Sequence, residues 1–437
     1  MKTVAEKAVS ASTHRPMTDA EKSSWLLNEA ASMQGTHIVR LRGRLDEGLL
    51  RESLRRLQQR HFLLRSRIVA GTPPEFVEDD AEIPLTVKPW REDLWIEEAE
   101  REVDDAIPWH AAPLARAVLL QSDENCDLLL SMHKAMHDGR SGVNALRDVI
   151  EFAAAIVERR EPRLPPLSGV YDISEQVTKR ASLWHLFPFF ARYLATIAAM
   201  RPASLPPESP APMREVQTGL HPCLFSVEET EALRRRCREN KTTIQGALSA
   251  AFLQAVAGEL CEKQGKQRIA VDNTFTYDVR SLLDTPVDDS MGTFVSATIS
   301  FHYAGPAVGF WELARETKSE VARNLSSGLV FTMIRIQTWM SARATSPEKL
   351  ARQVDKLRKP ATFVSNLGNF EYPREIGPWV REYQSGVLSA KHFGACLSAV
   401  VMTVSGRLSL NFFYAKPFLS REHVERLAHR VVSRLKF

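Results

Sequence analysis

The sequence predicts a mixed α/β protein made of two units, each of which mixes strands and helices in comparable amounts. Its 437 residues exceed what a single hydrophobic core usually organises, so we expect two domains. Strand-like and helix-like patterns occur on both sides of a proline-rich stretch at residues 159–222, which is typical of a linker. We therefore expect a flexible N-terminus at 1–20, a first unit at 21–160, a crossover at 161–221 and a second unit at 222–437.

The first unit is predicted to combine short strands with amphipathic helices. Thr18 to Glu21 has the capping residue and the acidic first turn of a helix start. Leu50, Leu54 and Leu57 recur at helical spacing within residues 46–61, and a charged helix is expected at 95–107. Strands are expected at 37–43, 65–69, 115–120 and 126–132. The last of these strands leads into a loop rich in polar side chains.

The crossover contains one apolar segment, at residues 183–200. Its length is close to that of a membrane span, roughly 18–20 residues. His185, Pro188 and Arg192 interrupt it, and a charge inside a span is costly. The pattern favours a helix packed on its own domain, while an apolar face toward a membrane or a lipidic substrate, or a true span, remain as alternatives.

The second unit shows the same mixture of elements. Ser226 is predicted to cap a helix at 227–240, and Glu229 completes a capping box. Further helices are expected at 242–256, 311–324 and 421–435, and strands at 223–226, 268–272, 294–300 and 361–365. A final hairpin is expected from strands 397–404 and 408–414 across the Ser405–Gly406 turn.

Composition excludes several classes of protein. The net charge of +4 is small and scattered, so nucleic acid is not an expected partner. The five cysteines are far apart and form no CxxC pair, which argues against a disulfide framework or a zinc site. The first residues hold no apolar core of signal-peptide length, so the expected location is the cytoplasm, with membrane association through residues 183–200 as an addition.

The loop at residues 133–142 carries most of the functional information. His133, Lys134, His137 and Asp138 follow an apolar strand and precede a helical pattern at 143–150. Loops between rigid elements often present catalytic side chains. A neutral imidazole is a good base near neutral pH, whereas a lysine needs its pKa lowered by burial or by a neighbouring cation.

Other interpretations of this loop remain open. Histidines beside a turn often only bond to nearby backbone. His133 and His137 have the i,i+4 spacing of a helical zinc pair, but Gly139 and Gly142 disfavour a helix here and no HExxH glutamate is present. Cys126, in the strand before the loop, is expected to be a core residue rather than a nucleophile.

Five segments, in order, resemble the condensation-domain and HHxxxDG acyltransferase superfamily, including stand-alone polyketide-associated acyltransferases and alcohol acetyltransferases. The most informative of them is the His133–Asp138–Gly139 frame. The others are the Arg60-His61-Phe62-Leu63-Leu64-Arg65 segment, residues 242–248, residues 272–283 with the following 291–295, and residues 363–368. This resemblance implies a fold of two chloramphenicol acetyltransferase-like lobes with a substrate tunnel between them.

The resemblance also implies roles for particular residues. The second histidine of the family signature is the catalytic base or positioning group, and here Lys134 stands in its place. Asp138 and Gly139 match the structural part of the signature, and Arg280 is the expected partner of Asp138. His133 and His137 are further catalytic candidates, with His133 taking the base position if the frame shifts by one. Ser365, Asn366 and Gly368 are expected to line the tunnel, although a strand-end turn is an equal interpretation.

The expected function is therefore transfer of an acyl group from a CoA or carrier-protein thioester to an alcohol or amine, in lipid or secondary-metabolite assembly. The thioester supplies the activation, so neither a metal nor an organic cofactor is expected. The alternative is a noncatalytic condensation-like module that binds or recruits a carrier-protein or synthetase partner. An open cavity reached by Lys134 favours catalysis, and a Lys134 that plugs the cavity in a salt bridge favours the module.

Overall fold

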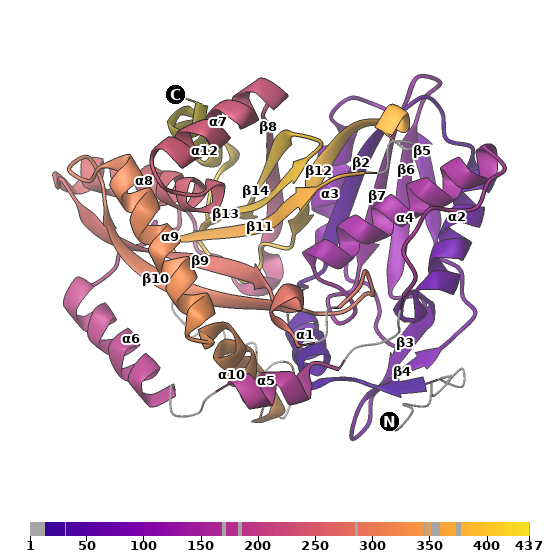
Figure 1. Ribbon diagram of the computed structural model, residues 1–437, viewed down its shortest axis with the longest axis horizontal. Helices are drawn as coiled ribbons and strands as arrows, with labels where there is room; N and C mark the ends of the chain where they lie inside the picture. Colours follow the sequence, from indigo (N-terminus) through magenta and orange to yellow (C-terminus); the bar gives the residue numbers. More distant parts are fainter. Residues whose placement is uncertain are drawn as a thin grey trace, which may run out of the picture.

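The computed structural model describes residues 14–30, 32–167, 172–181, 186–284, 287–343, 347, 349–350, 359–372 and 377–436. It is a mixed α+β structure in two halves that lie side by side (Figure 1). The mixed α/β class predicted from the sequence is confirmed.

The first half is built on a sheet with the strand order β12-β2-β7-β6-β5. Its elements before the crossover are β1 (His14–Pro16), α1 (Asp19–Ala30), β2 (Gly35–Arg42), α2 (Glu47–Arg60), β3 (Ser66–Val69), β4 (Glu75–Glu78), β5 (Leu85–Pro89), α3 (Leu94–Asp104), β6 (Ala115–Gln121), β7 (Asn125–Met132) and α4 (Gly139–Val157). A small sheet of β1, β4 and β3 lies beside it. Helices α2 and α4 pack together on one face of the larger sheet, and α3 lies on the other.

The apolar run in β7 is explained by burial on both faces. Leu128 and Leu130 pack with α2 and α4, whereas Leu129 faces α3 and the second half. A strand covered on both sides is apolar at successive positions instead of at alternate ones. This buried strand fixes the position at which the 133–138 loop leaves the sheet.

The second half is built on a sheet with the strand order β10-β9-β11-β13-β14-β8. Its elements are β8 (Gln217–Leu224), α7 (Val227–Glu239), α8 (Ile244–Gln264), β9 (Ile269–Asp278), β10 (Val295–Ala304), α9 (Phe310–Ser326), α10 (Leu329–Arg343), β11 (Thr362–Phe370), β12 (Val380–Leu388), β13 (Leu397–Val404), β14 (Arg407–Lys416) and α12 (Arg421–Lys436). Helix α8 packs on this sheet and is covered by α9 and α12. It is the one described helix long and apolar enough to cross a membrane, and 83% of its apolar window is buried in the core.

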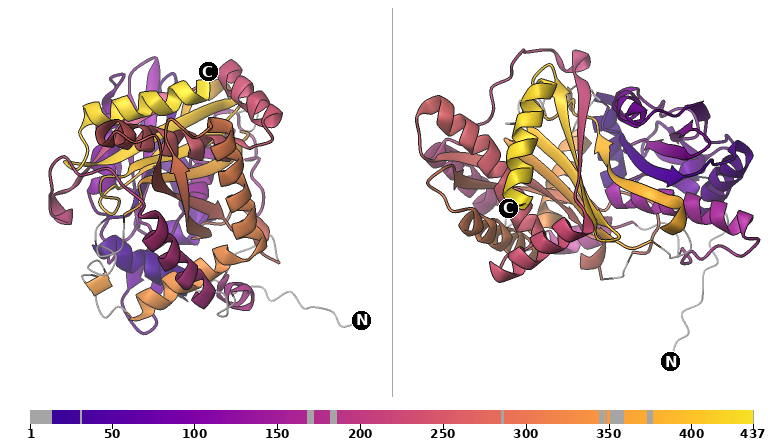
Figure 2. Two further views of the ribbon diagram at one scale, coloured as in Figure 1. Left: turned by 90° about the vertical axis from the view of Figure 1, so that its left-hand side faces the viewer. Right: turned by 90° about the horizontal axis from the view of Figure 1, so that it is seen from above.

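One strand of the second half belongs to the sheet of the first. β12 pairs antiparallel with β2, from Val380 opposite Leu41 to Leu388 opposite Gly35. Figure 2 shows this orange strand lying beside the indigo strands of the N-terminal half. The sequence division assigns residues 380–388 to the second unit, and no strand was expected there. The two halves therefore share a sheet as well as an apolar core between α3, β8, β13 and β14.

The crossover differs from expectation at its end. The strand expected at 223–226 begins earlier, at Gln217, so the proline-rich stretch runs directly into β8. Pro222 is tolerated because β8 is the edge strand of its sheet. On the open side of an edge strand a backbone N–H has no neighbouring strand to bond, so the N–H that proline lacks is not needed there. The described part of the crossover contains the α-helices α5 (Ser174–Arg180) and α6 (Leu186–Met200).

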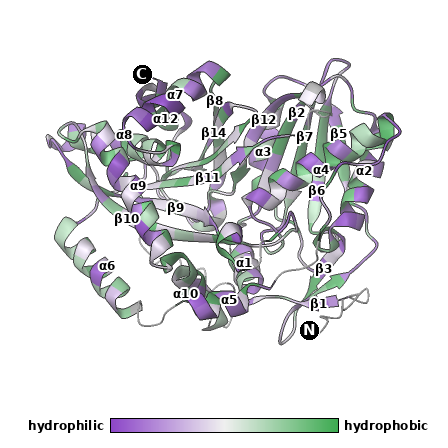
Figure 3. Ribbon diagram, viewed as in Figure 1, coloured by the Kyte–Doolittle hydropathy of each residue, from purple (hydrophilic) through white to green (hydrophobic). Residues whose placement is uncertain are grey.

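Helix α6 lies at the edge of the molecule and is mainly apolar along its length (Figure 3). Tyr193 packs against Phe301 of β10, with ring centroids 5.6 Å apart. Phe187, Phe190 and Leu194, at helical spacing, are exposed by 82%, 45% and 64%. The helix thus packs on its own domain with one side and presents an apolar face with the other. Residues 183–185 of the apolar segment lie outside the described residues.

Candidate functional site

The 133–138 loop is held at the point where β7 passes into α4. Asp138 is the N-cap of α4, and its carboxylate accepts a hydrogen bond of 2.9 Å from the backbone N–H of Ser141. Residues 133–138 form a loop, as expected for the stretch with His133 and His137, but α4 begins at Gly139, earlier than the helical pattern predicted at 143–150. A good N-cap residue stabilises a first turn that glycine disfavours.

Both glycines are explained by close neighbours. A Cβ at Gly139 would lie 2.4 Å from the side chain of Leu367 on β11, and a Cβ at Gly142 would lie 1.9 Å from Nε2 of His37 on β2. The first turn of α4 is therefore pressed against β2 on one side and against the second half on another. A side chain at either position would force these elements apart.

Asp138 joins the two halves through a buried ion pair with Arg280. Arg280 Nη1 lies 2.9 Å from Asp138 Oδ2, and Nη2 donates to Oδ1 at 3.0 Å, as expected from the family pattern. The backbone N–H of Phe294 also donates to this carboxylate, at 2.9 Å. Burial alone would raise the pKa of Asp138, but the Arg280 charge and these donors hold it well below its usual range. Asp138 is thus ionised at physiological pH and fixes the loop to the second half.

Lys134 faces a cavity of about 220 Å³ between the two halves. Among the described residues, its ammonium nitrogen has no hydrogen bond and no ion pair. Burial lowers the pKa of Lys134, and the charge of Asp138 partly opposes that change. Lys134 therefore does not plug the cavity in a salt bridge, and its amine is available to a bound molecule.

His133 and His137 are placed outside this cavity. His133 is fully buried, with Nε2 2.9 Å from Asn28 Nδ2 and 3.8 Å from the Glu29 carboxylate. His137 donates from Nδ1 to the carbonyl oxygen of His133 at 3.0 Å, which orients its ring. Burial, reinforced by Lys134, lowers the pKa of His137 well below its usual value. The shifted frame, with His133 in the base position, is not supported by this placement, because the His133 ring packs toward α1.

A third histidine, His37 on β2, lies in the site and was not expected there. It lines the cavity with Lys134, and its ring contacts that of His137 edge to face, with centroids 5.5 Å apart. Its Nε2 is buried without a hydrogen-bond partner. Burial, followed by the charge of Lys134, lowers the pKa of His37 to about 4. His37 is therefore a neutral imidazole at physiological pH.

The second half supplies the opposite wall. Ser365 and Asn366 on β11 line the cavity, as do Arg280 and Asp278 at the end of β9. Gly368 does not: it has a positive φ of 93° in the irregular part of β11, and its N–H donates to the Asn366 side chain at 3.0 Å. Gly368 therefore fits the strand-end turn better than a role in substrate binding, because its positive φ allows the strand to bend there.

The early Arg60–His61 segment has a structural position away from the cavity. Arg60 Nε lies 2.8 Å and His61 Nε2 lies 3.2 Å from the same carboxylate oxygen of Asp148, which is fully buried in α4. These contacts tie the end of α2 to the middle of α4. They hold the helix whose first turn carries Asp138.

The chain is similar to known proteins over part or nearly all of its length. A family model described as "Phthiocerol/phthiodiolone dimycocerosyl transferase C-terminus" matches residues 214–413. The chain is 24% identical over 427 residues to a linear gramicidin synthase protein of Brevibacillus parabrevis, covering 88% of this chain and 8% of that protein. The structure of polyketide synthase associated protein 5 from Mycobacterium tuberculosis matches with a TM-score of 0.69, at 14% identity, over 96% of this chain and 97% of that one.

The chain shares the fold of the superfamily of condensation domains and chloramphenicol acetyltransferase-like acyltransferases, and its residues 214–413 are similar to the matched transferase family. Its fold has the two lobes of this superfamily, as the resemblance implied. Two further solved structures match over nearly their whole lengths. TRI3 trichothecene 15-O-acetyltransferase from Fusarium sporotrichioides has a TM-score of 0.70 at 12% identity, covering 97% of this chain and 94% of that one. The X-domain in its complex with OxyB from teicoplanin biosynthesis has a TM-score of 0.62 at 19% identity, covering 100% and 95%.

The superfamily signature can now be placed in space. The two lobes meet at the loop that matches HHxxxDG, and Lys134, Asp138 and Gly139 of this loop line the cavity between them. Sequence reasoning missed His37 because it lies in a strand with no motif around it. A signal was present nonetheless: β2 is the strand next to the motif strand, with His37 opposite Leu130.

Proposed function

We propose that this protein is an acyltransferase that moves an acyl group from a thioester of CoA or of a carrier protein to an alcohol or an amine. The observation that carries the proposal is the unpartnered Lys134 amine, facing the interlobe cavity at the position of the superfamily's catalytic histidine. A desolvated lysine with a lowered pKa can act as a base.

In this proposal the neutral amine of Lys134 accepts the proton of the attacking hydroxyl or amine. A C–O or C–N bond forms at the thioester carbonyl, the C–S bond breaks, and the proton passes from Lys134 to the departing thiolate. His37 acts as a positioning residue. Its neutral ring places no second charge beside Lys134, whose own charge disfavours protonation of His37. No cofactor takes part, because the thioester already carries the activation.

The setting we propose is the assembly of lipids or secondary metabolites. Support comes from the family model named for a dimycocerosyl transferase and from the relative that is a peptide synthase, of which this chain spans only a small part. A carrier protein is accordingly a proposed donor beside CoA. The exposed face of α6 supports the proposal that the protein contacts a lipid surface while remaining in the cytoplasm.

The test is turnover with acetyl-CoA, palmitoyl-CoA and an acyl-carrier protein as donors, and with a primary alcohol or amine as acceptor, read by intact mass. Replacement of Lys134 by alanine is expected to lower kcat about 10²–10⁴-fold, the usual contribution of a positioned base. The rate of the wild type should rise with pH, with an apparent pKa below the ordinary lysine value. An exposed lysine on α8, in the Lys263→Ala variant, provides the matched control.

A conversion variant separates two views of Lys134. If lysine is the working base, Lys134→His should lower activity and shift the apparent pKa of the rate toward that of an imidazole. A gain of activity would mean that lysine replaced the histidine at the expense of catalysis. Rates equal to wild type in Lys134→Ala and His37→Ala would remove these residues from the reaction.

The second candidate function is a noncatalytic module that recruits a partner. The specific observation in its favour is the likeness to the X-domain, whose structure was solved in a complex with OxyB. No transfer with any donor, together with binding of a carrier protein in a pull-down from purified components, would support this candidate over the enzyme.

A further inference from the structure

A second cavity, of about 540 Å³, lies beside the site. Four helices form it: α1, α5, α6 and α10. It is outside the sheets of both halves and contains no residue of the 133–138 loop. We define this space as the helical cavity.

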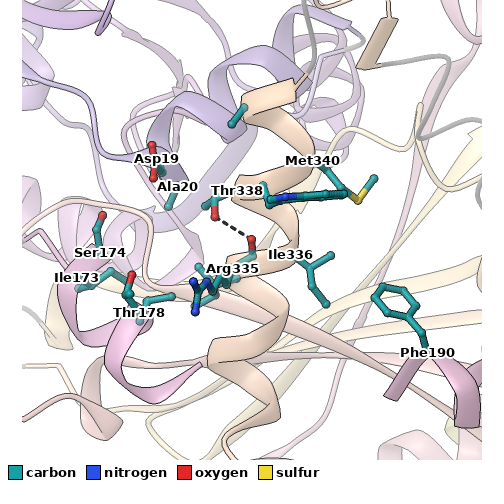
Figure 4. A pocket seen from close by; sticks show the side chains of 14 residues that line it. Asp19, Ala20, Ile173, Ser174, Thr178, Phe190, Arg335, Ile336, Thr338 and Met340 are labelled. Carbon is teal, nitrogen blue, oxygen red and sulfur yellow. Dashed lines mark hydrogen bonds between the residues drawn. The ribbon is translucent and has the colours of Figure 1, made fainter. Parts of the chain in front are cut away.

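The helical cavity has one polar edge and an apolar body. In Figure 4, Asp19, Ser174 and Thr178 lie together on one side, Arg335 lies between, and Ile336 and Phe190 lie on the other. The Arg335 guanidinium donates to the carbonyl oxygen of Ala181 at 3.1 Å. Val177 and Met340 add to the apolar lining. Such a lining suits an aliphatic chain better than a charged ligand, because removing apolar surface from water is favourable while desolvating a charge is costly.

The helical cavity adjoins the cavity between the two halves that Lys134 faces, which we call the reaction cavity. Ala20 of α1 and Ile334 and Thr338 of α10 line both of them. The reaction cavity, at about 220 Å³, is smaller than the roughly 300–1,000 Å³ typical of sites that enclose an organic ligand. A substrate with a long chain therefore needs more room than the space around Lys134, and the adjoining cavity supplies it.

We propose that the helical cavity binds the aliphatic chain of a long-chain substrate whose reacting end lies beside Lys134. This rests on the proposed function and narrows it to substrates with a long alkyl or acyl chain, carried by either the donor or the acceptor.

The position of the cavity explains the exposed aromatic residues around it. Phe190 of α6 and Trp339 of α10 line the helical cavity, yet they are 45% and 58% exposed. Exposed apolar side chains at the mouth of an apolar cavity lower the cost of moving a chain from a micelle or membrane into the protein. Phe187 and Leu194 extend the same apolar face along α6.

Binding is tested with the full chain and the fluorescent fatty acid cis-parinaric acid, without any need for turnover. Wild type should bind the probe. Hexadecanol and palmitoyl-CoA should displace it, whereas butanol and acetyl-CoA should not. Thr178→Trp places a large side chain in the cavity from an exposed position on α5, and should weaken probe binding about tenfold or more, equivalent to about 1.4 kcal/mol. Ile336→Trp repeats the test from α10.

The matched control is Lys179→Trp, at the next position of α5 and pointing to solvent. It should bind the probe like wild type. Displacement by hexadecanol alone or by palmitoyl-CoA alone would assign the chain to the acceptor or to the donor.

Two results would overturn the proposal: no probe binding by wild type, or equal binding by wild type and both cavity variants. Concentration-dependent dimerisation abolished by Thr178→Trp, without probe binding, would assign the cavity to a second copy of the chain instead. If no donor supports transfer but the probe pattern holds, the acyltransferase function fails and the chain-binding site stands. If transfer occurs with short donors only and the probe does not bind, the acyltransferase function stands and the chain-binding site fails.

Discussion

The buried pair of Asp138 and Arg280 gives the sharpest prediction for stability. Replacing Arg280 by methionine leaves the Asp138 carboxylate buried without its counter-charge. Removal of one partner of a buried pair costs about 3–5 kcal/mol. Asp138 keeps donors from Ser141 and Phe294, so we expect a value near the lower end, about 3 kcal/mol. The contact of Arg280 with the partly exposed Asp278 adds little.

A double-mutant cycle isolates this interaction. Asp138→Asn removes the charge but keeps a good N-cap, and the combined Asp138→Asn, Arg280→Met variant removes both charges. Urea unfolding followed by tryptophan fluorescence should show a lower midpoint for Arg280→Met with an unchanged slope. The combined variant should lose less free energy of unfolding than the sum of the losses in the two single variants. Strict additivity of the two changes would refute the view that this pair joins the lobes.

The same pair predicts a pH dependence of stability. The pKa of Asp138 is lower in the folded protein than in the unfolded chain, where it is about 3.9. Its contribution to the free energy of unfolding is therefore complete above about pH 4 and is lost as the pH falls toward the folded value. Wild type should lose stability with falling pH in this range more steeply than Asp138→Asn. Parallel curves for the two proteins would contradict the assignment.

Three further predictions concern other parts of the molecule. Gly142→Ala should lower the melting temperature, because its Cβ meets the His37 ring, and His37→Ala should restore part of the loss; differential scanning fluorimetry measures both, and no rescue would locate the strain elsewhere. Asp148→Ala should destabilise by about 3–5 kcal/mol in urea unfolding, since it removes a buried carboxylate that ties α2 to α4, and a loss below about 1 kcal/mol would make the contact incidental. Phe187→Ser with Leu194→Ser should reduce co-flotation with phosphatidylcholine vesicles, and undiminished flotation would exclude α6 as the lipid contact.

Sequence patterns identified most elements because those elements are locally determined. The capping box of Ser226 and Glu229 starts α7 as expected, and the turn at Ser405 and Gly406 joins β13 and β14. Both features depend on side chains and backbone angles within a few residues. The start of α4 was misjudged because the glycines received more weight than the capping ability of Asp138.

The parts that escaped prediction depend on distant contacts. β12 carries Arg381 and Glu382 and has register shifts, so its pattern is not that of a regular strand, and only pairing with β2 makes it one. His37 gains its neutral state and its place in the cavity from α4 and Lys134, which lie far along the chain. Helix α10, which lines both cavities, was not expected either. The loop that carries Lys134 was visible in the sequence, whereas the surroundings that set its pKa were not.

The pairing of β12, a strand of the second half, with β2 of the first half also constrains how the chain folds. During synthesis β2 is made long before its sheet neighbour β12, so one edge of the N-terminal sheet stays open in the interval. An open edge is a template for unwanted strand pairing. We expect the N-terminal half expressed alone to aggregate, and a permuted chain that carries residues 380–388 ahead of it to remain dispersed.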